Sequence, residues 1–232
     1  MKILLFGLMS VCAWGQIENP QIGIMLDVYG RARSVSGAPA AALVGASWFD
    51  GAVVSLACSA EGCVAKTESA LFTPAGVVVD APPGAALIAL DASSPGAAYV
   101  YFIESGKLER WTGSELVPMD FAPGGDVLSL RAIAGGFEYA IERDGEVWIG
   151  GKNLGVANCA LLLDGGGVLL ASGGQVRVLR PDGTEVDFAL TGVGGFLRMS
   201  DQYVEVITDA GMWALDIRPG REQMFLLPGV SH

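Results

Sequence analysis

The chain has 232 residues and a formal net charge of −11, with 25 acidic residues against 14 lysines and arginines. Hydrophobic residues make up 51% of it and charged residues only 17%, the reverse of a disordered composition, so we expect a folded chain. The negative charge argues against binding to nucleic acid or to an anionic membrane surface, because both interactions depend on basic side chains that neutralise phosphates.

The first fifteen residues have the pattern of a secretory signal peptide. Lys2 supplies a positive charge, Ile3–Val11 is an apolar run, and Ala13–Gly15 offers small residues for cleavage. The run is too short for a membrane span, which needs about twenty apolar residues. A buried N-terminal strand and a lipoprotein attached through Cys12 are the alternatives. We therefore predict a secreted or periplasmic protein, with one domain over residues 16–232 and no membrane span in the mature chain.

Export would place the remaining cysteines in an oxidising compartment, where disulfides persist. Cys58 and Cys63 bracket a turn-like tetrapeptide between two apolar segments, which predicts a disulfide across a β-hairpin. Two reduced thiols on neighbouring strands are the alternative. Cys159 opens an apolar run and is expected to be a small buried hydrophobic residue.

The sequence after residue 15 is typical of an all-β protein. Short segments rich in β-branched and aromatic residues are separated by Gly, Pro, Asp and Ser. No window of helical length keeps an apolar stripe without a Gly or Pro; the alanine-rich Ala38–Val44 is the nearest exception and is expected to allow a helical turn. The predicted strands include Ile24–Leu26, Val53–Ala57, Val77–Val79, Val127–Leu130 and Val204–Ile207.

Candidate hairpin turns recur along the chain at spacings of 39, 37, 39, 29 and 37 residues. They lie at Gly30, Ser69, Gly106, Gly145, Gly174 and Gly211. The later units divide into four short strands: 127–133, 137–143, 146–149 and 153–156 in the fourth unit, and 196–200, 203–208, 212–217 and 223–227 in the sixth. A four-stranded unit of about forty residues is typical of a propeller blade, which must pack on its neighbours to bury both faces.

Two segments strengthen this interpretation. Arg143–Gly151 resembles the Asp-Gly-x-Leu-Trp-Ile-Gly core of bacterial regulator-type, or NHL-like, propeller repeats. Leu179–Thr184 resembles the Pro-Asp-Gly turns of secreted propellers. The resemblance covers two of six units and implies a secreted bacterial propeller. In the first unit, only Gln16–Gln21 is available for an inner strand. The predicted fold is an array of about six four-stranded blades, with a β-sandwich or a β-solenoid as the alternative.

The sequence restricts catalytic chemistry, because His232 is the only histidine. Ser-His-Asp and Cys-His sites lack a base, and a His-ligated metal would need the tail to fold back. No nucleotide-binding P-loop occurs. A pair of carboxylates could still serve a glycoside hydrolase or lyase. Asp91 and Asp164 each end an apolar segment and are candidates near a central channel, although strand-ending turns explain both; no catalytic residue is assigned.

Acidic residues recur at or just before the repeated turn in five of the six units. They are Asp27, Glu68, Glu104, Asp144 and Asp209. Equivalent turns share one rim of a propeller, so these carboxylates are expected to form an acidic ring around the channel mouth that attracts a hydrated calcium ion or a basic partner loop. The preference of acidic residues for turns is the simpler explanation. Asp182–Asp187 only partly matches a calcium loop, so a metal site stays unknown.

Trp111, Trp148 and Trp213 follow equivalent turns and are expected to pack between blades rather than form a platform for sugars. The predicted function is an exported, non-catalytic binding module that holds a protein or polysaccharide through loops on one face. The candidate loops are Asp80–Gly84, Asp120–Asp126 and Thr191–Gly195. The alternatives are a carboxylate-dependent glycoside hydrolase or lyase acting in the central channel, and a domain of a larger exported protein.

Overall fold

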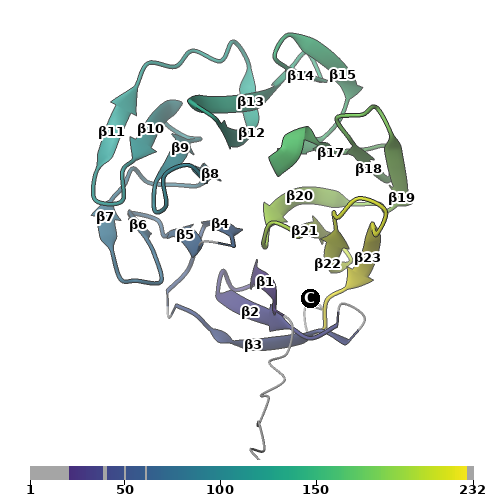
Figure 1. Cartoon of the computed structure of the whole chain (residues 1–232), viewed down its shortest axis with the longest axis horizontal. Coiled ribbons are helices and arrows are strands. Elements are labelled where there is room, and N and C mark those ends of the chain that lie inside the picture. Colours follow the sequence, from purple (N-terminus) through teal and green to yellow (C-terminus); the bar gives the residue numbers. More distant parts are fainter. Residues whose placement is uncertain (1–20, 39–40, 50, 61, 229–232) are drawn as a thin grey trace, which may run out of the picture.

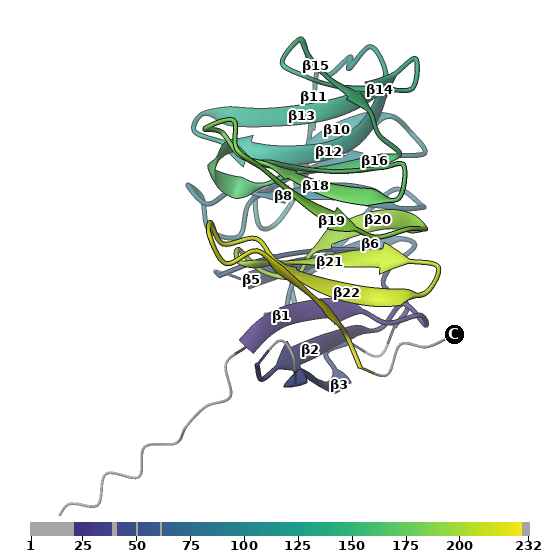
Figure 2. The same ribbon diagram turned by 90° about the vertical axis from the view of Figure 1, so that its right-hand side faces the viewer.

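The computed structural model describes residues 21–38, 41–49, 51–60 and 62–228. Over these ranges the chain forms six small antiparallel β-sheets arranged around a common axis (Figure 1). Seen from the side, the sheets lie next to one another with their strands crossing the thickness of the ring (Figure 2). None of the described residues forms a helix long and apolar enough to cross a membrane. The predicted signal peptide, residues 1–15, lies outside the described ranges.

Five of the sheets have four strands, and the first has three in the described residues. The first consists of β1 (Gln21–Leu26), β2 (Ala32–Ser36) and β3 (Leu43–Ser47). The second and third consist of β4 (Ser55–Ser59), β5 (Gly62–Lys66), β6 (Ala70–Phe72) and β7 (Val78–Asp80), then β8 (Ala86–Leu90), β9 (Ala98–Phe102), β10 (Lys107–Trp111) and β11 (Leu116–Met119). The fourth and fifth consist of β12 (Asp126–Ile133), β13 (Gly136–Arg143), β14 (Glu146–Ile149) and β15 (Lys152–Val156), then β16 (Cys159–Leu162), β17 (Val168–Ser172), β18 (Gln175–Leu179) and β19 (Glu185–Ala189). The sixth consists of β20 (Val193–Arg198), β21 (Tyr203–Thr208), β22 (Gly211–Asp216) and β23 (Gln223–Leu226).

Both faces of a sheet are covered by its neighbours, as strand β9 shows. All five of its residues are buried. Because side chains alternate across a strand, Ala98, Val100 and Phe102 pack toward the second sheet. Tyr99 and Tyr101 pack toward the fourth sheet instead. A strand in this position needs apolar residues in succession rather than in alternation, which explains the short continuous apolar segments of the sequence.

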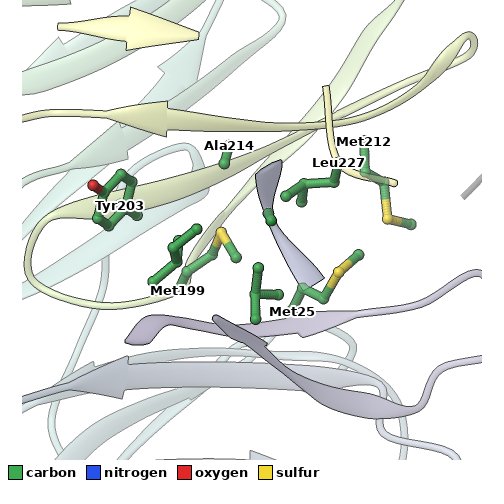
Figure 3. Close-up of a cluster of buried hydrophobic side chains, with 9 residues drawn as sticks. Met25, Met199, Tyr203, Met212, Ala214 and Leu227 are labelled. Atoms are coloured by element: carbon green, nitrogen blue, oxygen red, sulfur yellow. The ribbon is translucent and has the colours of Figure 1, made fainter. Parts of the chain in front are cut away.

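One cluster of buried hydrophobic side chains lies between each pair of neighbouring sheets, six in the described part of the chain. The cluster between the last sheet and the first closes the ring. There, Met25 of β1 packs with Met199, Tyr203 and Met212 of the sixth blade (Figure 3). Ile22 of β1 belongs to the same cluster. The chain is therefore a closed, six-bladed β-propeller. The predicted propeller is confirmed, and the alternatives of a two-layer sandwich and a solenoid are wrong.

The first blade lacks an innermost strand in the described residues. In the other blades the innermost strands are β4, β8, β12, β16 and β20, and β20 lies directly against β4. Strand β1 contacts β4 and β21 and is set back from the axis (Figure 1). It is followed by the turn at Gly30, equivalent to the turn after the second strand of every other blade. Of the predicted inner-strand segment, residue 21 opens β1 and residues 16–20 lie outside the described ranges.

The axial edge of β1 is satisfied by atoms of the sixth blade in place of a neighbouring strand. The Ile24 amide donates to the Met199 carbonyl at 3.2 Å. The Leu26 amide donates to a carboxyl oxygen of Glu205, also at 3.2 Å. The Ser200 hydroxyl donates to the Ile22 carbonyl at 2.8 Å. Because an unpaired buried amide is costly, these bonds satisfy the edge of β1 where the described residues supply no inner strand for the first blade.

The predicted positions of the repeated turns agree with the structure, whereas some predicted strand ends differ from the observed ones. Each turn connects what corresponds to the second and third strands of its blade, and the four-strand divisions of the fourth and sixth units agree with the structure to within three residues. The helical turn expected over Ala38–Val44 is wrong for its last two residues, because Leu43 and Val44 begin β3 and pair with β2. Sheet pairing overrides the helix propensity of alanine-rich sequence there.

The predicted disulfide between Cys58 and Cys63 is present and joins directly paired residues of β4 and β5. Cys159 is free and only partly buried. It packs against the cluster between the fifth and sixth blades, and burial raises the pKa of its thiol to about 11. Little of this thiol is ionised at neutral pH, so its role is packing rather than reactivity.

Removing the disulfide is expected to lower the free energy of unfolding by about 2 kcal/mol. The bond joins cysteines only five positions apart, so it constrains the unfolded chain weakly. The measurement is urea unfolding of the double variant Cys58→Ala, Cys63→Ala, with Cys159→Ala as the control that keeps the bond. A loss of about 3 to 5 kcal/mol in the free energy of unfolding, the size expected for truncating a fully buried tryptophan, would contradict this account.

Candidate functional site

A cavity of about 1100 Å³ opens on one face of the propeller. Its wall consists mainly of the loops between the first and second strands of the second to sixth blades. We call this side the cavity face, and the side that carries the repeated turns the turn face. The wall is predominantly apolar, and the described residues that line it include no aromatic side chain. Representative lining residues are Val64, Pro74, Val77, Leu90, Ile133 and Ala134.

The central channel is also apolar. A smaller cavity of about 240 Å³ lies among the inner strands and is lined by Ile88, Leu161 and Phe196, among others. No Asp or Glu is among the described residues that line it. Its charged lining residues in the described part of the chain are Arg131 and Arg198, which also line the larger cavity, whereas the carboxylates of Asp91, Asp164 and Asp201 line the larger cavity alone.

Two arginines from different blades hold the end of strand β16 at the wall of the cavity. Arg131 of β12 donates to the Leu163 carbonyl at 2.5 Å, and Arg198 of β20 donates to the Leu162 carbonyl at 2.6 Å. Both side chains are largely buried, with 11% and 16% of their surface exposed. These bonds tie the fourth, fifth and sixth blades together, so this part of the wall is preorganised.

Most charges at the cavity are already paired. Arg131 pairs with Glu138. Arg198 pairs with Asp164 at 2.5 Å. Asp91 pairs with Arg110 at 3.1 Å and accepts hydrogen bonds from the amide and hydroxyl of Ser93. These three pairs are electrically neutral, so they contribute shape and rigidity more than net charge.

Asp201 differs from the other charged residues of the wall. It is exposed, and it has no ion-pair partner among the residues that the structure describes. One of its carboxylate oxygens accepts the Ala60 amide at 3.1 Å. That bond joins a loop of the sixth blade to a loop of the second blade, at the place where the described part of the first blade has no inner strand. Among the described residues that line the cavity, Asp201 is therefore the one whose negative charge is not balanced by a basic partner.

No protein-family model and no curated protein matches the chain. Among solved structures, it is similar to PorZ, a bacterial surface component of the type-IX secretion system of Porphyromonas gingivalis, with a TM-score of 0.50 and 13% identity. It is also similar to the extracellular domain of a putative one-component system from B. thetaiotaomicron, with a TM-score of 0.50 and 10% identity. What they share is the propeller fold. The match covers 91% and 90% of this chain but only 38% and 36% of those chains.

The five acidic residues predicted to form a ring lie in the repeated turns, on the turn face of the propeller and opposite the cavity. Two of them meet. Glu68 accepts the Gly84 amide at 3.0 Å, and Glu104 packs so closely that a β-carbon on Gly84 would lie 2.3 Å from its carboxylate. The fully buried Lys66 donates to the Gly84 carbonyl at 2.5 Å. Burial lowers the pKa of Lys66, and the two glutamates partly oppose that shift.

The other three acidic residues have local structural roles in or beside their own turns. Asp27 accepts the amides of Tyr29 and Arg31. Asp144 adopts a φ of 58°, in the left-handed region that turn residues occupy. Asp209 packs against the connector at Gly192. In the described part of the chain, no three His, Cys, Asp or Glu residues are grouped to hold a metal ion. A ligand role for these five residues stays a prediction.

The three tryptophans do not share one environment. Trp111 is fully buried between the second and third blades. Trp213 is half-buried against the cluster between the fifth and sixth blades. Trp148 is half-buried and belongs to none of the six clusters; the Arg143 guanidinium lies 4.5 Å from its ring centre. The expectation of packing between blades therefore fits the first two and not Trp148.

Proposed function

We propose that this protein is an exported binding module that holds a segment of a partner protein in the cavity. The observation that carries the proposal is the size and preorganisation of the large, predominantly apolar cavity on the cavity face. Val77 and Ile133 in its wall are 38% and 46% exposed, so apolar surface is available to a ligand. The disulfide and the signal-like N-terminal sequence support export.

The composition of the wall favours a protein segment over a polysaccharide. Small and aliphatic side chains gain free energy by covering aliphatic side chains of a ligand. Sugars are hydroxyl-rich, so a site for them needs many hydrogen-bonding groups or flat rings against which their C–H faces can pack. The described lining has no aromatic ring, and its arginines are engaged with carbonyl oxygens and carboxylates.

Ligand binding is better supported than hydrolysis in this cavity. Asp91 and Asp164 both line it, as the hydrolase alternative requires. Each is paired with an arginine, however, through Arg110 and Arg198 respectively. A glycoside hydrolase needs one carboxyl group that donates a proton and a second that attacks or activates water. Two carboxylates committed to arginines fit a structural role.

The proposed ligand binds on the face opposite the three inter-blade connectors that the sequence suggests as binding loops. Asp80–Gly84, Asp120–Asp126 and Thr191–Gly195 link the outer strand of one blade to the inner strand of the next, so they lie on the turn face. The loops of the cavity face, including Ile133 at the end of β12, would make the contacts instead.

Ile133→Asp is expected to weaken binding of peptide ligands at least tenfold, because a carboxylate placed in the apolar wall must lose its water when a ligand docks. The measurement is retention of a displayed random-peptide library, followed by affinities of the selected peptides, with a glycan array run in parallel. Val156→Asp is the matched control, since Val156 is exposed on the outer strand of the same blade. Selected peptides that bind Ile133→Asp as well as wild type, or binding of glycans alone, would contradict the proposal.

A further inference from the structure

We propose that the segment held in the cavity carries a basic side chain, lysine or arginine, that pairs with Asp201. This inference rests on the proposed function and adds the chemistry of the ligand. An apolar wall by itself selects only for apolar surface. The charges at its edge decide which polar group an apolar segment can bring with it, because a charged ligand group that finds no partner would lose hydration without compensation.

Among the described residues of the wall, the charges leave one position for a positively charged group of the ligand. Arg131, Arg198 and Asp91 are each neutralised by a partner of the chain itself. Asp164 has 54% of its side chain exposed, yet its charge is balanced by Arg198. Asp201 alone among the charged lining residues has no such partner in the described structure. An acidic ligand group would meet uncompensated repulsion here, and a basic one would meet attraction.

The carboxylate of Asp201 is held in place for such a contact. Its Oδ2 accepts the Ala60 amide at 3.1 Å, which fixes the side chain across the joint between the sixth and second blades. Its Oδ1 has no hydrogen-bond partner among the described residues and can accept one from an ammonium or guanidinium group. A preorganised carboxylate at the edge of an apolar cavity is screened less than one on an open surface.

The charge of the whole protein acts in the same direction. With a net charge of −11, the molecule attracts basic segments and repels acidic ones over distances of about a Debye length, roughly 8 to 10 Å at moderate salt. Raising the salt concentration is therefore expected to weaken binding of basic peptides while leaving the apolar contribution intact.

The test compares peptides selected by wild-type protein with those selected by Asp201→Asn. The asparagine keeps an oxygen that accepts the Ala60 amide and removes only the charge. We expect wild type to enrich peptides that contain lysine or arginine beside apolar residues, and Asp201→Asn to lose that enrichment. A wild-type peptide should bind about fivefold more weakly when its basic residue becomes glutamine, and Asp201→Asn should abolish the difference.

Asp209→Asn is the matched control, because it makes the same change at an exposed residue on the turn face of the same blade. If Asp209→Asn rather than Asp201→Asn removes the preference, the basic group binds the turn face and the inference is wrong. If the selected peptides show no basic enrichment but still depend on Ile133, the inference fails while the proposed function stands. If no peptide binds in a way that Ile133→Asp disrupts, both fail.

Discussion

Glu205→Gln is expected to remove most of the pH dependence of stability between pH 5 and pH 8, and its stability relative to wild type should rise steadily over that range. Glu205 is fully buried in β21 at the joint between the sixth and first blades. Burial raises the pKa of its carboxyl group to about 8, and the hydrogen bond from the Leu26 amide only partly opposes that shift. Its other oxygen is buried and has no hydrogen-bond partner among the residues that the structure describes.

The free energy of unfolding falls as the pH rises, because the folded and unfolded chains release the Glu205 proton at different pH values. The ordinary pKa of this carboxyl is 4.5, so below pH 4.5 both states hold the proton and no penalty exists. Between pH 4.5 and about 8 the unfolded chain releases a proton that the folded protein keeps, and stability falls by roughly 1.4 kcal/mol per pH unit. Above pH 8 the loss is complete. At pH 7 it amounts to roughly 3 kcal/mol.

A glutamine keeps the acceptor for Leu26 and carries no titratable proton, so it does not accumulate this penalty. The measurement is urea unfolding of both proteins at pH values from 5 to 9. Glu185→Gln, an exposed change on β19, is the control and should leave the pH profile of wild type unaltered. Parallel profiles for wild type and Glu205→Gln would show that the carboxyl group is not buried in the folded protein.

The features that could be predicted from the sequence are those determined by residues close together in the chain. The turn at Gly145 and its neighbours recur because tight connections between strands favour particular residues, here Gly with a φ of 80° after Asp144. The Cys58–Cys63 bond was predictable because a short hairpin places its flanking residues directly opposite each other. Periodicity of such local signals was enough to indicate blades and their number.

The site could not be predicted because its contacts join distant parts of the chain. Arg131 reaches the Leu163 carbonyl from another blade, and Asp201 reaches the Ala60 amide across the joint between the last and second blades. No motif marks these residues, and the loops that carry them differ in length from blade to blade. The set-back first blade has the same origin: whether β20 can meet β4 depends on how six blades close, which no single segment specifies.

Tryptophans at equivalent positions of different blades are buried to different extents and so contribute differently to the free energy of unfolding. Trp111 lies at the end of β10 with no exposed surface and packs with Val64, Leu71 and Phe102. Trp148 follows an equivalent turn but remains half-buried, with Arg143 over its ring. The repeat therefore predicts where an indole occurs and not how much free energy its burial contributes.

Trp111→Ala is expected to lower the free energy of unfolding by about 3 to 5 kcal/mol, because it leaves a cavity between two blades that cannot collapse independently. Trp148→Ala should cost about 1 kcal/mol, since it removes partly exposed surface and one cation–π contact. The indole N–H of Trp111 is buried with no acceptor in the described part of the chain, so Trp111→Phe should be much milder than Trp111→Ala. Thermal and urea unfolding of the three variants would establish the order. Equal losses of unfolding free energy for the two alanine variants would mean that the second and third blades do not pack around Trp111, contrary to the cluster described here.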